Sequence, residues 1–309
     1  MRLLIAETKA AAYADSLAEM PGLDITVAET QSEVTAGAAV CEIWLGAPDL
    51  LVEPLRRGLR PRWLQSTWAG ITPLLAEGLP RDYLLSRAVG VFGQVISEYA
   101  LTYMLANERQ LLARLDSQRA GHWDTTLPGT LAGKCVLIVG TGDIGSAIAQ
   151  LLRGFGCELL GISRQLHTGS VFDRTGTLEA LPTFAARADY VINLLPDTSR
   201  TRDVYNAAFF QEMKPSALFI NVGRGGAVVE NDLVAALEQG HLAGAVLDVF
   251  RQEPLPHDHP FWSAPNLVIT GHVAGPTLVP LMSGLFKDNV RRLQTGEDLR
   301  GQVDFNRGY

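Results

Sequence analysis

The sequence predicts an α/β fold in which two domains each contain a parallel β-sheet. Short apolar runs of β-type residues recur along the 309 residues, and helical stretches separate many of them. This alternation is typical of parallel sheets with crossover helices. A glycine-rich turn also joins one of these runs directly to a helix. The chain is longer than a usual single hydrophobic core requires, so two domains are expected.

The expected strands are short runs rich in Val, Ile and Leu. In chain order they cover residues 3–6, 25–28, 42–46, 62–68, 135–140, 158–163, 190–195, 218–223, 245–250 and 267–270. Because helical segments lie between many of them, we expect parallel strands with helices on the faces of the sheets.

The domain boundaries follow from two helical segments. The longest expected helix covers residues 95–115 and follows the glycine-bracketed segment 90–93, which we interpret as a hinge. A last helix after Pro276 is expected to return to the first domain. Residues 93–275 are therefore expected to form a domain inserted into one built from residues 1–92 and 276–309.

The bulk composition favours small molecules or further copies of the chain as partners. A formal net charge of −7 gives no electrostatic reason to expect a nucleic acid or an anionic membrane as a partner. No run approaches the roughly 18 apolar residues of a spanning helix, and the start resembles no leader peptide, so a cytoplasmic location is expected.

Cys41, Cys135 and Cys157 are widely separated, which suits reduced, buried thiols. No metal is expected, because His257 and His259 alone make a weak ligand set.

A dinucleotide-binding turn is expected where the run 135–140 ends. Gly140, Gly142 and Gly145 enclose Asp143 and Ile144, with a strand expected before them, a helix after, and a second strand from residue 158. In this context the first glycine permits a tight turn, the second lets a pyrophosphate approach the backbone, and the third lets helix and strand pack closely. Unpaired amides at the helix start attract the phosphates.

The residues after the second strand favour NADP over NAD. An NAD-binding protein usually carries an acidic residue there, which accepts a hydrogen bond from the ribose hydroxyl. This chain has Ser163 at that place, and Arg164 offers a forked cation suited to a phosphate. The alternative is that Arg164 is a solvated surface residue and that NAD is used.

Three charged residues follow the last three expected strands of the inserted domain. Arg224, Glu253 and His272 are expected to converge, because ligands bind outside the carboxyl ends of strands in open α/β sheets. Arg224 suits a substrate carboxylate and carbonyl, His272 can give a proton to a forming alkoxide, and Glu253 can orient the imidazole and favour its charged form. Taken singly, each has a structural alternative: a loop cation, a turn residue before Pro254 and a hydrogen-bonded strand-end side chain.

The motifs together resemble a known family. They are LAGKCVLIVGTGDIG, NLLPDTSRTRDVYN, INVGRGGAVVE, AVLDVFRQEPLP, HPFW and ITGHVAG, in that order along the chain. In content and order they resemble the D-isomer-specific 2-hydroxyacid dehydrogenases, the family that includes glyoxylate/hydroxypyruvate reductases. The resemblance spans nearly the whole chain.

The resemblance implies two Rossmann-like domains, the nucleotide-binding one inserted into a flavodoxin-like substrate domain, and a homodimer. It implies catalytic roles for Arg224, Glu253 and His272. It also places Asp248 near the nicotinamide, and the cofactor beside three further residues, Leu195, Pro196 and Val222.

On the substrate side, the resemblance implies that the backbone amides of Ala69, Gly70 and Ile71 hold the substrate carboxylate. Trp44 either lines the pocket or belongs to the core. Besides Ser163 in place of the usual acidic residue, two departures from the family pattern stand out. Thr72 replaces a common Asp after the carboxylate loop, and Gly271 replaces the usual proline before the histidine.

The expected function is the NADPH-preferring reduction of small 2-oxo acids to D-2-hydroxy acids, with His272 as general acid/base. Glyoxylate, hydroxypyruvate and bulkier 2-oxo acids all fit this expectation. One alternative is an NAD-dependent dehydrogenase with a different substrate range. The other is a non-catalytic nucleotide sensor similar to the family's corepressor relatives.

Overall fold

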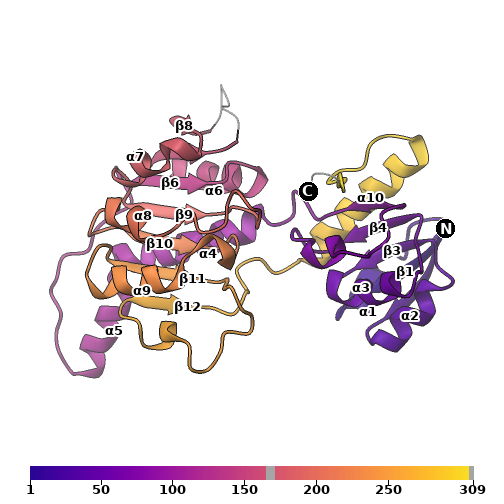
Figure 1. The fold of residues 1–309 in the computed structure, drawn as a ribbon, viewed down its shortest axis with the longest axis horizontal. Coiled ribbons are helices and arrows are strands. Elements are labelled where there is room, and N and C mark those ends of the chain that lie inside the picture. The colour runs from indigo at the N-terminus through magenta and orange to yellow at the C-terminus, as the bar shows by residue number, and fades with distance from the viewer. Residues whose placement is uncertain (165–170, 306–309) are drawn as a thin grey trace. The chain divides into compact units, whose positions relative to one another are not determined.

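The chain divides into two compact α/β units. The computed structural model describes residues 1–164 and 171–305. Unit 1 comprises Met1–Val91 and Thr277–Tyr309, and unit 2 comprises Phe92–Pro276 (Figure 1). The strands of each unit pair in parallel within one sheet, which confirms the predicted α/β class with two parallel sheets.

Unit 1 contains a five-stranded sheet in the order β2-β1-β3-β4-β5. Its strands are β1 (Arg2–Ala6), β2 (Asp24–Ala28), β3 (Ile43–Gly46), β4 (Trp63–Ser66) and β5 (Leu84–Ser86). Its helices are α1 (Ala10–Leu17), α2 (Gln31–Ala38), α3 (Pro48–Arg56) and α10 (Val279–Thr295), with a 3₁₀ turn η1 at Thr72–Leu75. Strand β5 was not predicted from the sequence.

The helix α10 returns the end of the chain to unit 1 and completes its core. Phe286 stacks on Trp63 of β4, with ring centroids 5.1 Å apart and planes 7° from parallel. The buried Asn289 side chain donates to Gln65 Oε1 over 2.8 Å and to the Arg300 carbonyl over 3.0 Å. These contacts join the sheet, α10 and the segment after it.

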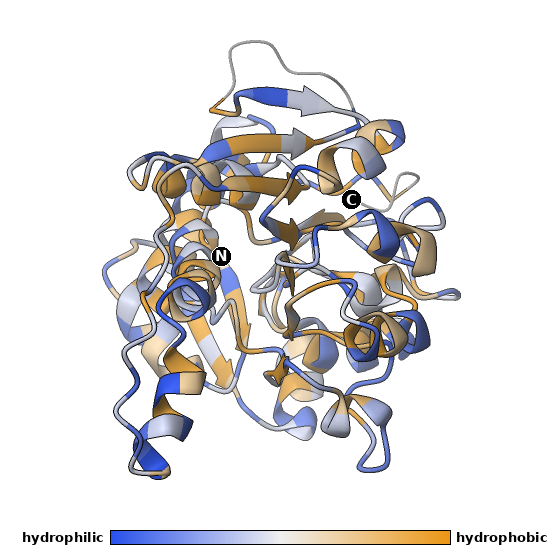
Figure 2. Cartoon of the chain, turned by 90° about the vertical axis from the view of Figure 1, so that its left-hand side faces the viewer, coloured by the Kyte–Doolittle hydropathy of each residue, from blue (hydrophilic) through white to orange (hydrophobic). Residues whose placement is uncertain are grey.

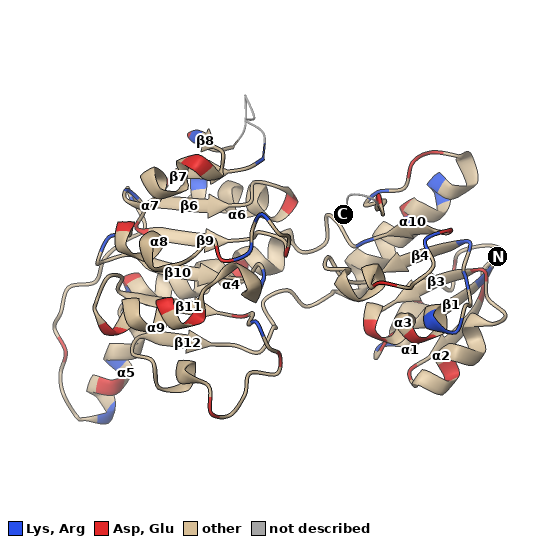
Figure 3. Cartoon of the chain, viewed as in Figure 1, with Lys and Arg blue, Asp and Glu red and all other residues tan. Residues whose placement is uncertain are grey.

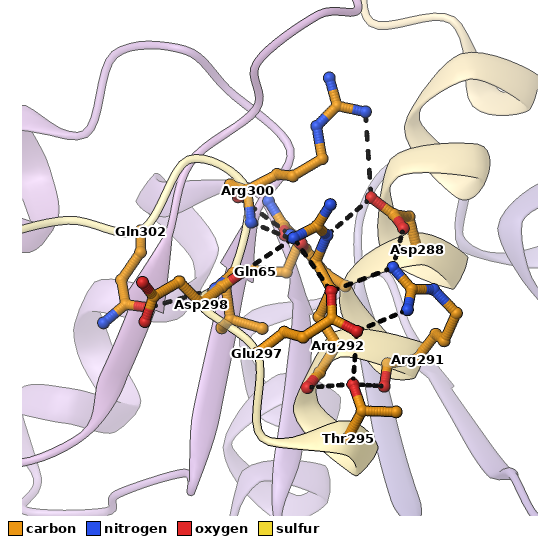
Figure 4. A network of polar contacts seen from close by, with 11 residues as sticks. Gln65, Asp288, Arg291, Arg292, Thr295, Glu297, Asp298, Arg300 and Gln302 are labelled. Atoms are coloured by element: carbon orange, nitrogen blue, oxygen red, sulfur yellow. Dashed lines mark hydrogen bonds and ion pairs between the residues drawn. The ribbon is translucent and has the colours of Figure 1, made fainter.

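Charged side chains fix the C-terminal turn of α10 on its outer face. Asp288 pairs with Arg292 at 3.0 Å and with Arg291 at 3.2 Å, and Arg291 also reaches Glu297 at 2.7 Å (Figure 4). The helix ends at Gly296, whose φ of +74° suits a residue without a Cβ. The network therefore directs the chain from α10 back toward the sheet.

Unit 2 contains a seven-stranded sheet in the order β12-β11-β10-β9-β6-β7-β8. Its strands are β6 (Cys135–Val139), β7 (Glu158–Ile162), β8 (Arg174–Gly176), β9 (Tyr190–Asn193), β10 (Leu218–Asn221), β11 (Gly244–Leu247) and β12 (Leu267–Ile269). Its helices are α4 (Gly93–Glu108), α5 (Leu111–Arg119), α6 (Asp143–Arg153), α7 (Leu181–Ala185), α8 (Ala207–Glu212) and α9 (Glu230–Glu238).

The central strands of unit 2 are buried on both faces. Strands β6, β9, β10 and β11 consist entirely of buried residues, and none of these residues is charged (Figures 2 and 3). Helices on both faces of a parallel sheet require such continuous apolar strands, because neither face meets water. Several expected strands were longer than the observed ones, because the apolar pattern continues into loops that stay buried.

The helix predicted at residues 95–115 is interrupted. Helix α4 ends at Glu108, Gln110 has a left-handed backbone with φ of +52°, and α5 starts at Leu111. A left-handed residue ends the run of helical hydrogen bonds, so the apolar pattern alone overestimated the length of this helix. The described part of α5 contains no buried residue.

All three cysteines are free and buried. Burial raises the pKa of the Cys135 and Cys157 thiols to about 11, which keeps both protonated at neutral pH. Among the described helices, none has both the length and the apolar character needed to cross a membrane.

Candidate active site

The predicted functional residues of unit 2 lie at the carboxyl edge of its sheet. Strands β6, β9, β10, β11 and β12 run parallel, so the loops that follow them leave from the same edge. The strand order reverses between β6 and β9. In open α/β sheets this is the topological switch point, where ligands bind.

The turn after β6 has the geometry of a phosphate-binding loop. Gly140 has a φ of +113°, and a Cβ there would lie 3.1 Å from the Leu194 Cβ, so a residue with a side chain would be strained. A Cβ on Gly145 would overlap the carbonyl oxygen of Gly140, whereas one on Gly142 would meet nothing within 4 Å. The N–H groups of Gly142, Ile144 and Gly145 donate to no residue that the structure describes. These free donors at the start of α6 suit an anion.

A buried asparagine pair holds the next two loops. Asn193 ends β9 and Asn221 ends β10, and the Asn193 amide donates to Asn221 Oδ1 over 2.8 Å. Asn193 Oδ1 accepts the N–H of Leu195 at 3.0 Å, and Asn221 Oδ1 accepts the N–H of Gly223 at 3.1 Å. Sequence reasoning missed both residues, although a single Asn closing an apolar strand in YVIN and LFIN is a recognisable signal.

The other residues predicted to border the cofactor follow the same edge. Ser163 comes directly after β7 and donates its N–H to the Gly176 carbonyl at 2.9 Å, and the exposed Arg164 follows it. Leu195 and Val222 are buried, whereas Pro196 is exposed. The segment 165–170 that follows Arg164 lies outside the described residues.

His272 and Glu253 form a direct pair. The Nδ1 atom of His272 lies 2.7 Å from Oε2 of Glu253, and because a carboxylate only accepts, Nδ1 carries the proton of this bond. The other carboxylate oxygen, Oε1, accepts the N–H of Phe250 at 2.9 Å. The His272 side chain is 52% exposed, and its Nε2 makes no hydrogen bond to a described residue. The imidazole is therefore oriented at one nitrogen and open at the other.

Asp248 anchors the loop that carries His272. This carboxylate is only 2% exposed, and it accepts the N–H groups of Val273 at 2.8 Å and Ala274 at 2.9 Å. Thr270 donates its hydroxyl to Asp248 at 2.5 Å and also contacts the Tyr99 hydroxyl at 2.7 Å. Neither Thr270 nor Tyr99 was predicted as a site residue, although Thr270 belongs to the ITGHVAG motif.

Arg224 follows β10, between two glycines that other loops contact closely. A Cβ on Gly225 would overlap the backbone of Phe250, and one on Gly223 would lie 2.9 Å from the backbone nitrogen of Leu195. Burial lowers the pKa of the Arg224 guanidinium, and the nearby carboxylates of Glu253 and Asp197 oppose that shift. The guanidinium remains a cation at neutral pH, and its electrostatic partner is the same Glu253 that holds His272.

In unit 1, the predicted carboxylate loop follows β4. Ala69 and Gly70 are partly exposed, and Ile71 is buried at the start of η1. Within the described part of the chain, the N–H groups of Ala69, Gly70 and Ile71 donate no hydrogen bond. Successive free backbone donors of this kind form a site that suits an anion.

Trp44 belongs to the core of unit 1. Its side chain is fully buried, and its indole N–H donates to the Cys41 carbonyl oxygen over 3.0 Å. The sequence allowed Trp44 either to line the substrate pocket or to belong to the core. In the structure its side chain belongs to the core. The reason is that β3 is covered on both faces, so neither side of the strand points outward.

The two histidines considered as metal ligands lie elsewhere. His259 Nε2 lies 3.3 Å from Glu230 Oε2, and its Nδ1 accepts the Phe261 N–H at 3.2 Å, so both ring nitrogens have protein partners. His257 is exposed. Among the described residues, no group of three or more His, Cys, Asp or Glu side chains could hold a metal ion.

Comparisons with known proteins agree with this geometry. The family model described as "D-isomer specific 2-hydroxyacid dehydrogenase, NAD binding domain" matches residues 101–274. Glyoxylate/hydroxypyruvate reductase A of Photorhabdus laumondii is 34% identical over 237 residues, which are 76% of this chain and 74% of that protein.

Solved structures extend the similarity over the whole chain. A D-isomer specific 2-hydroxyacid dehydrogenase family protein from Aeromonas salmonicida is 37% identical, with 98% of this chain and 99% of that one covered and a TM-score of 0.93. An NADPH-dependent glyoxylate/hydroxypyruvate reductase from Sinorhizobium meliloti, solved with NADP and sulfate, is 28% identical, with 100% and 99% covered and a TM-score of 0.87. The chain therefore belongs to the D-isomer specific 2-hydroxyacid dehydrogenase family and is an NAD(P)-dependent oxidoreductase.

Proposed function

We propose that the protein is an NADPH-preferring reductase that converts small 2-oxo acids, such as glyoxylate or hydroxypyruvate, to D-2-hydroxy acids. One observation carries this proposal above the others. His272 is held by Glu253 through a 2.7 Å contact at Nδ1, while its Nε2 is left open at the carboxyl edge of the sheet. A proton donor oriented in this way is what the reduction of a carbonyl requires.

Each residue of the site has a stated role in this proposal. When bound, NADPH supplies the hydride that the carbonyl carbon receives. His272 donates the Nε2 proton to the carbonyl oxygen, and Glu253 stabilises the charged imidazole before that transfer. Arg224 binds the carboxylate and carbonyl oxygens of the substrate as a forked cation. In the oxidation direction, His272 accepts the hydroxyl proton.

The proposed cofactor site consists of the turn after β6, Ser163 and Arg164 after β7, and the loops after β9, β10 and β11. The free N–H groups at the start of α6 would hold the pyrophosphate, and Asp248 would lie near the nicotinamide. Leu195, Pro196 and Val222 would border the cofactor. Ser163 and Arg164 favour NADPH, since Ser163 stands in place of the usual acidic residue and Arg164 offers a cation suited to the ribose phosphate. The relative from Sinorhizobium meliloti that was solved with NADP supports this preference.

The substrate carboxylate would bind the backbone N–H groups of Ala69, Gly70 and Ile71. Their lack of partners among the described residues supports this assignment, because successive free backbone donors are suited to an anion.

The proposal is tested by following oxidation of NADPH and of NADH with glyoxylate, hydroxypyruvate and phenylpyruvate. Turnover with a higher kcat/KM for NADPH than for NADH is expected, and the order of the three acids reports the size of the pocket. A preference for NADH would contradict the role given to Arg164. Clear cofactor binding without turnover of any 2-oxo acid would instead support a nucleotide sensor.

We further propose that the protein is a homodimer, formed through the segment that includes α5. This segment of unit 2 starts after Glu108 and ends at Gly129, whose N–H donates to the Glu108 carbonyl over 2.9 Å. Within it, α5 buries no residue, Trp123 is 88% exposed and Leu127 is 87% exposed. A short helix without core contacts and large exposed apolar side chains are both typical of an association surface.

This second proposal is tested by changing Trp123→Ser and Leu127→Ser together and measuring mass by light scattering. The double variant is expected to become a monomer while keeping the far-ultraviolet circular dichroism of the parent. Trp262→Ser is a matched control, because Trp262 is also exposed but lies outside the segment. A parent protein that is already monomeric would contradict the proposal.

A further inference from the structure

Glu7 places a carboxylate at the carboxyl edge of the unit 1 sheet. It is the first residue after β1, and its Oε1 accepts the Thr67 hydroxyl at 2.5 Å. Strand β3 lies between β1 and β4 in the sheet, and Thr67 is the first residue after β4. The side chain of Glu7 therefore crosses the end of β3. At that end β3 has Gly46, which carries no side chain, and a Cβ there would overlap the Ala6 carbonyl oxygen.

The carboxylate is held firmly and keeps acceptor capacity. Its Oε2 accepts the Thr8 N–H at 3.1 Å, so each oxygen has one donor among the described residues. A carboxylate offers about four lone-pair directions, so each oxygen can accept one more bond. The side chain is partly exposed, which leaves those directions open to a ligand.

The charges around Glu7 do not neutralise it. Burial raises the pKa of the Glu7 carboxyl, the hydrogen bonds from Thr67 and Thr8 oppose that rise, and the nearby Asp49 adds to it. Lys9 is the nearby cation, and no ion pair between it and Glu7 is formed in the described structure. Because two donors hold its oxygens in place, the ionised Glu7 carboxylate is a fixed acceptor that repels other anions.

The Glu7 carboxylate also lies close to the proposed carboxylate loop. Thr67 precedes Ala69 by two residues, which limits the separation of their Cα atoms to about 7 Å. The Thr67 backbone is itself fixed, because its N–H donates to the Gly46 carbonyl at 3.0 Å and its carbonyl accepts the Thr277 hydroxyl at 3.0 Å. Glu7 and the free amides of Ala69 to Ile71 thus belong to one rigid edge.

We propose that Glu7 is a specificity-determining residue, which selects 2-oxo acids carrying a hydrogen-bond donor such as a hydroxyl group and disfavours those carrying a second anionic group. This inference rests on the proposed function, since it takes the amides of Ala69, Gly70 and Ile71 as the site of the substrate carboxylate. A donor on the substrate meets an acceptor-only group, whereas a second carboxylate meets a like charge.

The test compares kcat/KM with NADPH for pyruvate, hydroxypyruvate and oxaloacetate. Hydroxypyruvate differs from pyruvate by a hydroxyl, and oxaloacetate differs from pyruvate by a second carboxylate. The kcat/KM of each acid divided by that of pyruvate therefore measures the effect of the added group. In Glu7→Gln, the kcat/KM ratio of hydroxypyruvate to pyruvate is expected to fall by about tenfold, because the substrate hydroxyl loses a charge-assisted hydrogen bond. The ratio of oxaloacetate to pyruvate is expected to rise by about tenfold, because the repulsion between two carboxylates is lost.

A second variant separates the charge of Glu7 from its position. Thr67→Val removes the hydroxyl that holds the carboxylate and keeps the charge. The hydroxypyruvate ratio is expected to fall, while the oxaloacetate ratio stays near that of the parent protein. This variant also carries the test if Glu7→Gln does not fold, which thermal unfolding would reveal. Glu53→Gln is the matched control, because Glu53 lies in the same unit and pairs with Arg57 on the surface of α3.

The outcomes separate this inference from the proposed function. Unchanged substrate ratios in Glu7→Gln and Thr67→Val, with full turnover of pyruvate or glyoxylate, would overturn the role of Glu7 and leave the reductase proposal intact. A parent protein that reduces none of the 2-oxo acids would overturn both. Equal changes of the ratios in Glu53→Gln would show a general charge effect and would also remove the assignment.

Discussion

At the scale of single residues, the backbone of His272 explains why its loop needs so many hydrogen bonds. His272 has a φ of +57°, a left-handed conformation that is uncommon for residues other than glycine. The N–H groups of His272, Val273 and Ala274 all donate to Asp248, the first to its carbonyl at 2.8 Å and the others to its carboxylate. These bonds offset the cost of the conformation, which is of order 1–3 kcal/mol.

Replacing His272 tests its role as proton donor. His272→Ala is expected to lower kcat by about 10² to 10⁴, the usual contribution of general acid catalysis, with little change in the Kd for NADPH. Stopped-flow turnover and fluorescence titration measure the two quantities. His257→Ala is a suitable control, because His257 is an exposed histidine of the same unit. Activity equal to the parent in His272→Ala would remove the assignment.

Replacing Asp248 tests the anchoring of the histidine loop. In Asp248→Asn, one carboxylate oxygen becomes an NH₂ group that faces a backbone N–H, so a buried donor loses its acceptor. The free energy of unfolding is expected to fall by about 1–3 kcal/mol. Denaturant unfolding checks this value, and kcat is expected to fall with it because His272 loses its position.

Asp258→Asn provides the comparison for Asp248→Asn, since Asp258 is exposed in the same unit. It is expected to change the free energy of unfolding by less than about 0.5 kcal/mol. A stable Asp248→Asn protein with the kcat of the parent would show that the loop does not depend on this carboxylate.

At the scale of elements, the turn between β6 and α6 separates two uses of glycine. Gly145 is needed for packing, because a Cβ would overlap the Gly140 carbonyl oxygen. Gly142 has open space around it and a φ of −71°, which other residues adopt readily. The fold therefore requires Gly145, while any requirement for Gly142 comes from a ligand.

Two alanine substitutions test this separation. Gly145→Ala is expected to lower both the melting temperature and the affinity for NADPH, because α6 must move away from the turn. Gly142→Ala is expected to keep the melting temperature within a few degrees and to weaken NADPH binding alone, because the methyl group takes the space of the pyrophosphate. Calorimetry and titration of both variants provide the comparison, and equal NADPH affinity in Gly142→Ala and the parent would contradict the proposed cofactor site.

At the scale of the whole molecule, each unit is a complete α/β layer structure with its own core. Unit 1 achieves this only with the end of the chain, since Phe286 and Asn289 of α10 complete the core beside Trp63 and Gln65. The stability of unit 1 therefore depends on residues more than 200 positions away from its sheet.

Truncating Phe286 tests that dependence. Phe286→Ala removes a fully buried ring stacked on Trp63, and the free energy of unfolding of unit 1 is expected to fall by about 3–5 kcal/mol. Denaturant unfolding followed by tryptophan fluorescence, to which Trp44 and Trp63 of the unit 1 core both contribute, measures this loss. Leu281→Ala on the same helix is the control, because Leu281 is 43% exposed. Similar losses in both variants would contradict a specific role for the stacked ring.

Much of the fold and of the unit 2 site could be predicted from local sequence patterns. The buried strands of parallel sheets are continuous apolar runs, and the glycines of the turn after β6 meet steric demands within a few residues. Arg224, Glu253 and His272 follow consecutive neighbouring strands, so chain order alone suggested one edge. The position of Trp44 was not predictable, because a strand buried on both faces shows no alternation that tells the core from a pocket.

Residue types at short, fixed spacings were enough to predict the α/β class, the dinucleotide-binding turn and the family of this protein. Which groups touch is known only from the folded chain. The Asn193–Asn221 pair and the bond between Glu7 and Thr67 join residues 28 and 60 positions apart, respectively. The interruption at Gln110 is a backbone conformation that apolar periodicity does not encode. Contacts across a sheet depend on strand order and register, which are set by packing of the whole core and not by any one segment.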